Sequence, residues 1–402
     1  MAKKLNHILK KIAHFQVVHP FFTILVLIML TLIIWGGISK VQTIASLENM
    51  MPKITPEIKA FNDLRDNHLG QDMIIIVVEI DRDSSLIHGI NDVRDYDIYQ
   101  YLSKIEDELK KETEVIGIYS YASGILFYSN KSNFEEIDKI YYKNLIVNED
   151  FKKYVSNFVN DDYSRTMLII NSDIASNDLA MDLFSSKVKS IVSDIGKPAG
   201  IKIKFTGTPI IQQRLGELIN KDRADTQWIA IIFVFTITML IFRSLLSALV
   251  PIIVVFVSVN WLYGIMGYSN LPISTLAGGV AAMVIGIGID FAIHIMNKFK
   301  YERKLGNSIK NSIELAVTET GTALVATSMT TMVAFLAFLF GVMPEMGRFG
   351  ILMAIGIFFS LVFSLFGLPA LLIIEEKIIY YIKKTWKFGI DKEFHLVEEK
   401  QK

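Results

Sequence analysis

The sequence contains no cysteine, so neither disulfide bonds nor thiolate metal sites can form within this chain. It also has no excess of either charge, because 41 Lys and Arg residues balance 41 Asp and Glu residues. A neutral chain lacks the basic surface of a nucleic-acid binder, and we expect no such partner. A Walker-type phosphate loop is absent too, which argues against ATP as an energy source. We expect no cofactor and no bound metal.

Hydrophobic residues make up 51% of the chain and charged residues only 20%, a composition too apolar for an ordinary soluble protein. Most of the apolar residues lie in six runs. A membrane-spanning helix needs about 20 apolar residues, and most of the runs approach that length. The sequence therefore predicts an α-helical membrane protein with six transmembrane helices, near residues 21–38, 228–242, 245–268, 271–297, 320–341 and 349–374.

A polar stretch of about 180 residues, long enough for a folded domain, separates the first two runs. The first run is too long for the core of a signal peptide, and we expect a retained membrane anchor. The predicted organisation is a cytoplasmic N-terminus (1–20), transmembrane helix 1 (21–40), an extracytoplasmic domain (41–223), helices 2–6 (224–376) and a cytoplasmic tail (377–402).

The orientation follows from the basic residues between the runs. Four lysines precede the first run, and "NKFKYERKLGNSIK" follows the fourth, whereas the connectors "GYSNLPIS" and "GVMPEMGR" are almost free of them. The positive-inside rule then places both termini in the cytoplasm and the large domain outside the cytoplasmic membrane. Trp35, Trp228 and Trp261 are predicted to form an aromatic belt near the outer helix ends.

The large domain shows the pattern of a split-βαβ, ferredoxin-like fold. Strand-like runs at 72–80, 115–122, 165–174 and 201–208 alternate with two helical stretches. An insertion at about 124–160 is either a lid or partner surface, or simply extra helices with solvated faces. Asp81, Asp83 and His88 could suggest a metal site, but acidic residues are ordinary at a strand end, and we favour a turn.

One acidic residue, Asp290, lies well inside an apolar run, in "AAMVIGIGIDFAIHIMNKF". Counting back from Lys298 at about 1.5 Å per residue places it near the middle of a hydrocarbon core about 30 Å thick. A carboxylate there costs at least about 2.5–3.5 kcal/mol, so we expect it to face the bundle interior or a watery cavity. Asp290 is therefore predicted to be a proton-relay acid. The alternative is a structural polar contact between helices.

Candidate relay partners lie near this acid in the predicted bundle. His294 is one helical turn away on the same face, and the fifth run supplies the hydroxyls of Ser328 and Thr331 in "TSMTT". These hydroxyls can equally bond to the backbone of their own helix. Asn260, in the third run, is expected to form a hydrogen bond between helices.

Small residues lie next to Asp290 in the sequence. Helices can approach closely where side chains are small, so a neighbouring helix is expected to pack here. Gly286 and Gly288, together with Phe291, are predicted to form the packing surface of the fourth helix around Asp290.

Several stretches together resemble the resistance-nodulation-division superfamily, and most closely its lipid-handling branches, the mycobacterial membrane protein large family and the hydrophobe/amphiphile exporters. The similar stretches are "GTPIIQQRLGELINKD", "FRSLLSALVPI", "GIGIDFAIHIMNKFKYERKLG", "TALVATSMTTMVAFLAFLF" and "FGILMAIGIFFSLVFSLFGLPALL". The resemblance implies a transporter rather than an enzyme, driven by the proton-motive force, which exports hydrophobic or amphiphilic molecules. It also implies a ferredoxin-like porter domain, and it maps the superfamily's helix-four acid onto Asp290.

The chain departs from this superfamily in two respects. Members usually carry two six-helix units, whereas this chain has one, so we expect a homodimer with its two-fold axis along the membrane normal. The acid is often followed by tyrosine in the superfamily, but Phe291 occupies that position here and has no hydroxyl to donate. His294 and the hydroxyls of the fifth run therefore become the more important candidates for the relay partner of Asp290.

Two other functions are compatible with a six-helix unit of this kind. One is an accessory subunit of protein export, although the asparagine-aspartate pair and the Asp-Arg of that branch are absent from "GIGIDFAIHIMNKF". The other is a lipid or sterol receptor that does not transport.

Overall fold

The computed structural model describes residues 2–45, 51–52, 55–66, 72–81, 90–174 and 178–385. The chain divides into two compact units. We call Met1–Met51 with Leu218–Lys402 the helical unit, and Pro52–Glu217 the α/β unit. The predicted large domain, 41–223, is slightly wider than the α/β unit at both ends.

Six helices of the described chain are long and apolar enough to cross a membrane. They are α2 (Pro20–Trp35), α10 (Thr208–Phe242), α11 (Leu245–Tyr268), α12 (Val280–Lys304), α14 (Gly321–Leu336) and α15 (Pro344–Phe366). All six lie in the helical unit except the first ten residues of α10, which belong to the α/β unit. Several boundaries differ from the prediction. The fourth run, predicted at 271–297, gives a helix from Val280 to Lys304. The second predicted run is the end of one 35-residue helix, α10. The sixth run is interrupted at Gly367, after which α16 (Leu368–Thr385) begins, because Pro369 has no N–H and its ring clashes with the carbonyl of the preceding turn.

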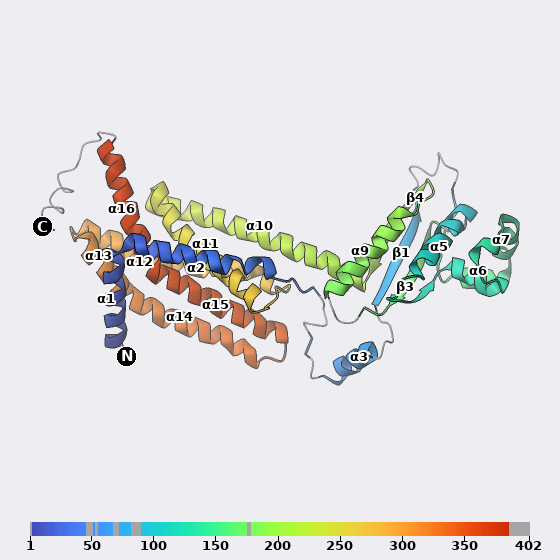
Figure 1. Ribbon diagram of the computed structural model, residues 1–402, viewed down its shortest axis with the longest axis horizontal. Helices are drawn as coiled ribbons and strands as arrows, with labels where there is room; N and C mark the ends of the chain where they lie inside the picture. The colour runs from blue at the N-terminus through green and yellow to red at the C-terminus, as the bar shows by residue number, and fades with distance from the viewer. Residues whose placement is uncertain are drawn as a thin grey trace. The chain divides into compact units, whose positions relative to one another are not determined.

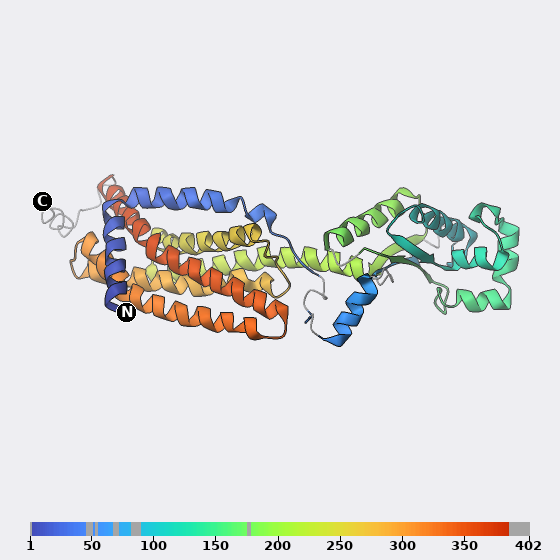
Figure 2. The ribbon, with the colours of Figure 1, turned by 60° about the horizontal axis from the view of Figure 1, so that its bottom comes forward.

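Three of these helices form the centre of the unit. More than half of the apolar stretch of α11, α12 and α15 is buried, whereas only about a tenth or less of the stretch is buried in α2, α10 and α14. Helices α11, α12 and α15 run side by side (Figures 1 and 2). A Cβ atom added to Gly288 on α12 would lie 2.6 Å from the Ser360 Oγ atom on α15. One added to Gly356 on α15 would lie 2.4 Å from the Val284 Cγ2 atom on α12. The small residues Gly288 and Gly356 thus allow α12 and α15 to pack closely.

The aromatic belt and the predicted link through Asn260 both need correction. Trp261 is only 8% exposed, and its Nε1–H donates to Thr31 Oγ1 at 2.9 Å, which joins α11 to α2. Trp35 and Trp228 are exposed, as a belt requires. Asn260 Nδ2 donates to the Phe256 carbonyl of its own helix at 2.7 Å. The prediction of an interhelical bond from Asn260 is therefore wrong, and the neighbouring tryptophan makes that bond.

One end of the bundle carries short helices and most of its ion pairs. Helix α1 (Ala2–Val18) lies across this end rather than along the bundle (Figures 1 and 2). It packs against α13 (Ile309–Leu315), α16 and the π-helical turn Ala316–Thr320. The Lys298 Nζ atom lies 2.8 Å from Glu302 and 2.7 Å from Glu319, and Arg303 pairs with Glu376 at 3.1 Å. These contacts fix the end of α12 to its neighbours.

The α/β unit is built on a four-stranded antiparallel sheet. Its strands are β1 (Asp72–Ile80), β2 (Val115–Tyr119), β3 (Arg165–Ser172) and β4 (Ile201–Gly207), in the order β2-β3-β1-β4. This is the strand order of a split-βαβ arrangement. Alternate residues of β1 and β3 are buried on the face covered by α5 (Tyr96–Leu109) and α9 (Asp178–Asp194), where the core of the unit lies.

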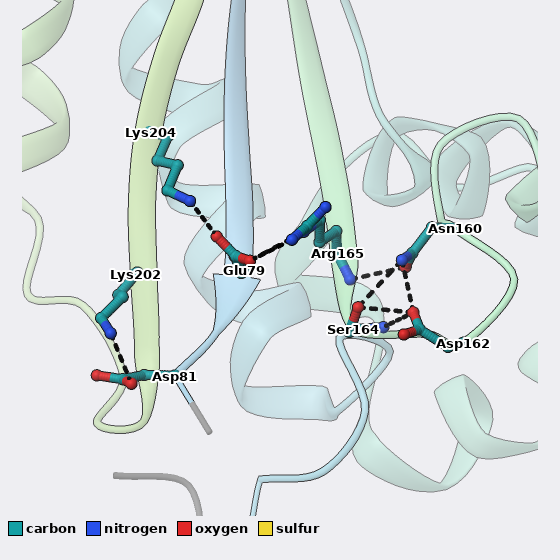
Figure 3. A network of polar contacts seen from close by, with 8 residues as sticks. All are labelled: Glu79, Asp81, Asn160, Asp162, Ser164, Arg165, Lys202 and Lys204. Carbon is teal, nitrogen blue, oxygen red and sulfur yellow. Dashed lines mark hydrogen bonds and ion pairs between the residues drawn. The ribbon is translucent and has the colours of Figure 1, made fainter. Parts of the chain in front are cut away.

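The opposite face of the sheet carries a row of ion pairs (Figure 3). Glu79 on β1 bonds to Arg165 on β3 at 2.7 Å and to Lys204 on β4. Hydrogen bonds from Lys204 and Arg165 hold the pKa of Glu79 below its ordinary value. At the end of β1, Asp81 pairs with Lys202 at 2.8 Å (Figure 3), so a charged strand end accounts for this residue. Asp83 and His88 lie outside the described residues.

The predicted insertion is helical. It contains α6 (Tyr121–Ser129), α7 (Lys139–Ile146) and α8 (Glu149–Val155). Strand β2 ends earlier than predicted because Ser120 caps α6: its Oγ atom accepts from the Ala122 N–H at 2.9 Å, and its own N–H donates to Ser123 Oγ at 2.9 Å. Residues 120–122 thus begin a helix rather than extend the strand.

One carboxylate of the α/β unit is completely buried. Glu106 on α5 has no exposed surface and accepts a hydrogen bond from the Ser120 hydroxyl, while Lys110 Nζ lies 3.8 Å from its other oxygen. Burial raises the pKa of Glu106 to about 7, although Ser120 and Lys110 partly oppose the shift. The folded unit therefore binds one more proton than the unfolded chain between the ordinary pKa and about pH 7.

The raised pKa of Glu106 predicts a stability that depends on pH. A group of this kind contributes stability below its unfolded pKa and loses that contribution as pH rises through the folded value. In the full-length protein we expect amide protection factors of α5 and the sheet, which are exchange rates corrected for the intrinsic rate at each pH, to be higher at pH 5 than at pH 8. Glu106→Gln should remove this difference and stabilise the unit at pH 8 by up to about 3 kcal/mol. Glu108→Gln, at an exposed position two residues away, is the control and should behave as wild type. A pH dependence that survives in Glu106→Gln would contradict the assignment.

Candidate functional site

Asp290 belongs to a line of exposed residues along α12. Going along the helix, Met283, Gly286, Asp290, His294 and Asn297 are all exposed in the single chain. Their spacing of three or four residues places them on one face of the helix. We call these five residues the α12 stripe. The opposite face of α12 packs against α11 and α15.

Asp290 lies near the middle of the helical segment Ala277–Lys304, with thirteen residues before it and fourteen after it. The last eight residues of this segment include five charged side chains, so the apolar part is shorter than the helix. The depth of Asp290 in a membrane stays a prediction, because the segment is marked by its length and composition. Within one chain, however, the carboxylate does not face the bundle interior, because the buried side of α12 is the one that carries Gly288. Among the described residues, none donates a hydrogen bond to Asp290 or pairs with it.

The predicted relay partners divide into two groups. His294 lies on the α12 stripe, one turn from Asp290, as predicted from the spacing. Ser328 and Thr331 lie on α14, which packs mainly against α15 rather than against α12. The Ser328 hydroxyl donates to the Val325 carbonyl at 3.0 Å, and the Thr331 hydroxyl donates to the Thr327 carbonyl at 2.9 Å. Both hydroxyls are thus bonded to their own helix, and no contact between described residues of one chain joins them to Asp290.

The three predicted packing residues have different surroundings. Gly288 is in tight contact with α15, as the 2.6 Å approach to Ser360 shows. Phe291 is 7% exposed and lies on the buried side of α12. A Cβ atom added to Gly286 would meet no atom within 4 Å, so this glycine is open in the single chain.

Two buried serines of α15, on the helix that packs against the side of α12 opposite Asp290, were not predicted from the sequence. Ser360 and Ser364 on α15 are fully buried, and neither Oγ atom has a hydrogen-bond partner among the described residues. The signal was present in "FFSLVFSLF", where the two serines are four residues apart in an otherwise apolar stretch. Their small size lets α12 approach α15 at Gly288, opposite the α12 stripe.

The described part of the chain shows no group of three or more His, Asp and Glu side chains that could hold a metal ion. Asp290 and His294 supply only one carboxylate and one imidazole on an open helix face. This arrangement has a group that can accept and release a proton, but no nucleophile held by a base and an orienting residue.

Comparison with known proteins finds a family model and several relatives that match this chain. The MMPL family model matches residues 55–379. A membrane protein of Methanocaldococcus jannaschii is 32% identical over 390 residues, which is 95% of this chain and 98% of that protein. The trehalose monomycolate exporter of Mycolicibacterium smegmatis is 24% identical over 195 residues, which is 44% of this chain and 19% of the exporter. The chain thus spans nearly all of the archaeal relative but about a fifth of the exporter.

The difference between Gly288 and Gly286 gives a stability prediction. Gly288→Val places methyl groups against Ser360 and should destabilise the helical unit by about 1–3 kcal/mol, which is typical of overpacking. Gly286→Val adds the same side chain to an open position on the same helix and should leave the stability of the isolated chain unchanged. Thermal unfolding in a detergent that keeps the protein monomeric measures both. Equal effects of the two substitutions would show that α12 does not pack as described.

Proposed function

The chain belongs to the MMPL family, and from this premise we propose that it is a secondary transporter that moves hydrophobic or amphiphilic molecules, driven by protons. The observation that carries the proposal is a single acidic residue, Asp290, inside the apolar part of a central helix that is long enough to cross a membrane. A carboxylate is rarely kept at such a depth without a role in moving ions or protons. The name of the trehalose monomycolate exporter supports cargo with a lipid-like part.

We propose that the transporter is a homodimer in which the α12 stripes of two chains face each other. The stripe cannot face lipid without a cost of at least about 2.5–3.5 kcal/mol for the carboxylate. Gly286 leaves room for a second helix to approach, since nothing lies within 4 Å of its missing side chain. A two-fold axis along the membrane normal would bring equal depths of the two stripes together.

In this dimer, Asp290 would meet the partner subunit's Asp290 at the same depth, with His294 one turn away. Two carboxylates close together in a water-poor site do not both ionise readily, so the pair can hold a proton and release it. Because Phe291 has no hydroxyl and Ser328 and Thr331 bond within α14, His294 is the relay partner best placed on the same face. A proton that crosses 100 mV supplies about 2.3 kcal/mol, enough to bias the packing of two central helices between two states.

We further propose that the large domain is the porter domain and lies outside the cytoplasmic membrane, with both termini in the cytoplasm. The basic connectors support this orientation. The split-βαβ strand order of the α/β unit supports the role of the domain.

Replacement of the carboxylate tests the proton coupling. In proteoliposomes with an imposed pH gradient, we expect Asp290→Asn to reduce gradient-driven transfer of a fluorescent phospholipid to the level of protein-free vesicles, because asparagine cannot carry the proton. Glu108→Gln removes an exposed carboxylate of the α/β unit, far along the chain from α12, and should transport as wild type. Transport by Asp290→Asn at the wild-type rate would exclude the mechanism. Binding of the phospholipid with no effect of the gradient in the wild type would instead favour a receptor.

The absence of native cysteine allows a direct test of the dimer interface. Single cysteines placed at Met283 or Gly286, on the α12 stripe, should form intermolecular disulfides in oxidised membranes, because such bonds need Cα atoms within about 7 Å. Val333 on α14 and Leu240 on α10 are equally exposed in the single chain but lie on peripheral helices. Cysteines at these two positions are the controls and should leave the protein monomeric on a non-reducing gel. Cross-linking at the controls but not on the stripe would exclude this interface.

A further inference from the structure

Helix α1 is fixed to the helical unit by one of its faces. Leu9 and Ala13 are buried, and the Gln16 side chain donates from Nε2 to the Leu365 and Phe366 carbonyls at 3.0 and 3.1 Å. These contacts hold α1 across the end of the bundle, directly before α2 begins at Pro20 (Figure 2). We expect a helix in this position to lie at the level of the lipid headgroups rather than in the hydrocarbon.

A cavity of about 500 Å³ opens on the outer side of α1, between α1 and α13. Two lysines and two histidines of α1 line it together with His19, the N-cap of α2, and Glu314 of α13 is the only acidic residue of the lining. Glu314 lies 3.3 Å from the Nδ1 atom of His14. Among the described residues, none pairs with the ammonium groups of Lys10 and Lys11. The cavity therefore presents two ammonium groups that have no ion-pair partner in the described part of the helical unit.

The same cavity has an apolar side. Phe15 and Val18 line it and are 47% and 52% exposed. The apolar surface continues onto α2 through Phe22, whose ring centroid lies 6.2 Å from that of Phe15. A ligand that fills this site needs an anionic group next to Lys10 and Lys11 and a hydrocarbon chain next to Phe15. A free anion would leave the apolar side uncovered.

We propose that the cavity between α1 and α13 binds an anionic glycerophospholipid of the adjacent leaflet, with its phosphate at Lys10 and Lys11 and an acyl chain along Phe15, Val18 and Phe22. Basic pockets beside membrane helices bind anionic headgroups in this way, and each lysine near such a surface adds to the attraction. The site is independent of Asp290 and of the α12 stripe, so it does not depend on the proposed transport function. A bound lipid here would hold α1 against α13 and the π-helical turn that leads into α14.

Native mass spectrometry of the full-length protein, titrated with phosphatidylglycerol or with phosphatidylcholine of the same acyl chains, tests the proposal. We expect wild type to bind phosphatidylglycerol more tightly. The double substitution Lys10→Gln/Lys11→Gln should weaken this binding by about 30-fold, as the loss of two lysines near an anionic surface predicts, and should leave phosphatidylcholine binding unchanged. Glu314→Gln should tighten phosphatidylglycerol binding, because it removes the acid of the lining. Lys10→Arg/Lys11→Arg keeps both charges and should bind as wild type.

The matched control is Lys4→Gln/Lys310→Gln, which removes two exposed lysines of α1 and α13 that do not line the cavity. It should bind phosphatidylglycerol as wild type. If this control lost as much affinity for phosphatidylglycerol as Lys10→Gln/Lys11→Gln, the effect would be general electrostatic attraction, and the proposal would be overturned. Inorganic phosphate is the competitor that distinguishes a soluble anion from a lipid. Displacement of the lipid by phosphate at an equal concentration, or equal affinity for the two phospholipids, would also overturn it.

Discussion

The packing of α12 against α15 determines where the one deep carboxylate of this protein must lie. Gly288 approaches Ser360, and Gly356 approaches Val284, so closely that no larger residue fits at either glycine without displacing a neighbour. A rotation of α12 that hid Asp290 inside the bundle would replace these contacts with the wider α12 stripe. The exposure of Asp290 is therefore a consequence of tight packing on the opposite side of the helix. The packed side of α12 offers Asp290 no polar partner, and this is the reason for proposing a dimer through the opposite side of the helix.

The two ends of α12 are held differently, which bears on how a change at Asp290 could move the helix. At one end, Lys298 joins Glu302 to Glu319, and Arg303 is bonded to Glu376 on α16. At the other end, α12 follows a single 3-10 turn, Ala277–Gly279, and a side chain at Gly279 would meet no atom within 4 Å. A shift driven from the middle of the helix is therefore expected to be larger at the end near Gly279 than at the end fixed by ion pairs.

Much of the fold could be predicted because its patterns are long and regular. Six apolar runs predicted six spanning helices, and alternating apolar residues predicted the four strands within a few residues of their ends. The position of a residue along a helix could also be predicted, since a rise of about 1.5 Å per residue converts sequence position into distance. The direction in which a helical side chain points could not be predicted, because it depends on how the neighbouring helices pack. Trp261 illustrates this: its position near a helix end suggested an interface residue, yet the rotation of α11 directs it to Thr31.

The same limit explains the mixed result at the candidate site. Asp290 and His294 lie on one helix, so their spacing alone placed them on a common face. Ser328 and Thr331 lie on a different helix, and α15 packs between it and the centre of the unit, so nothing in the sequence fixed their distance from Asp290. Their own-helix hydrogen bonds are the ordinary state of a hydroxyl in an apolar helix, where the carbonyl one turn away is the nearest acceptor. A hydroxyl already satisfied in this way has little to gain from a distant carboxylate. The polar environment of Asp290 must then be supplied by groups that share its face, or that reach this face from a second chain.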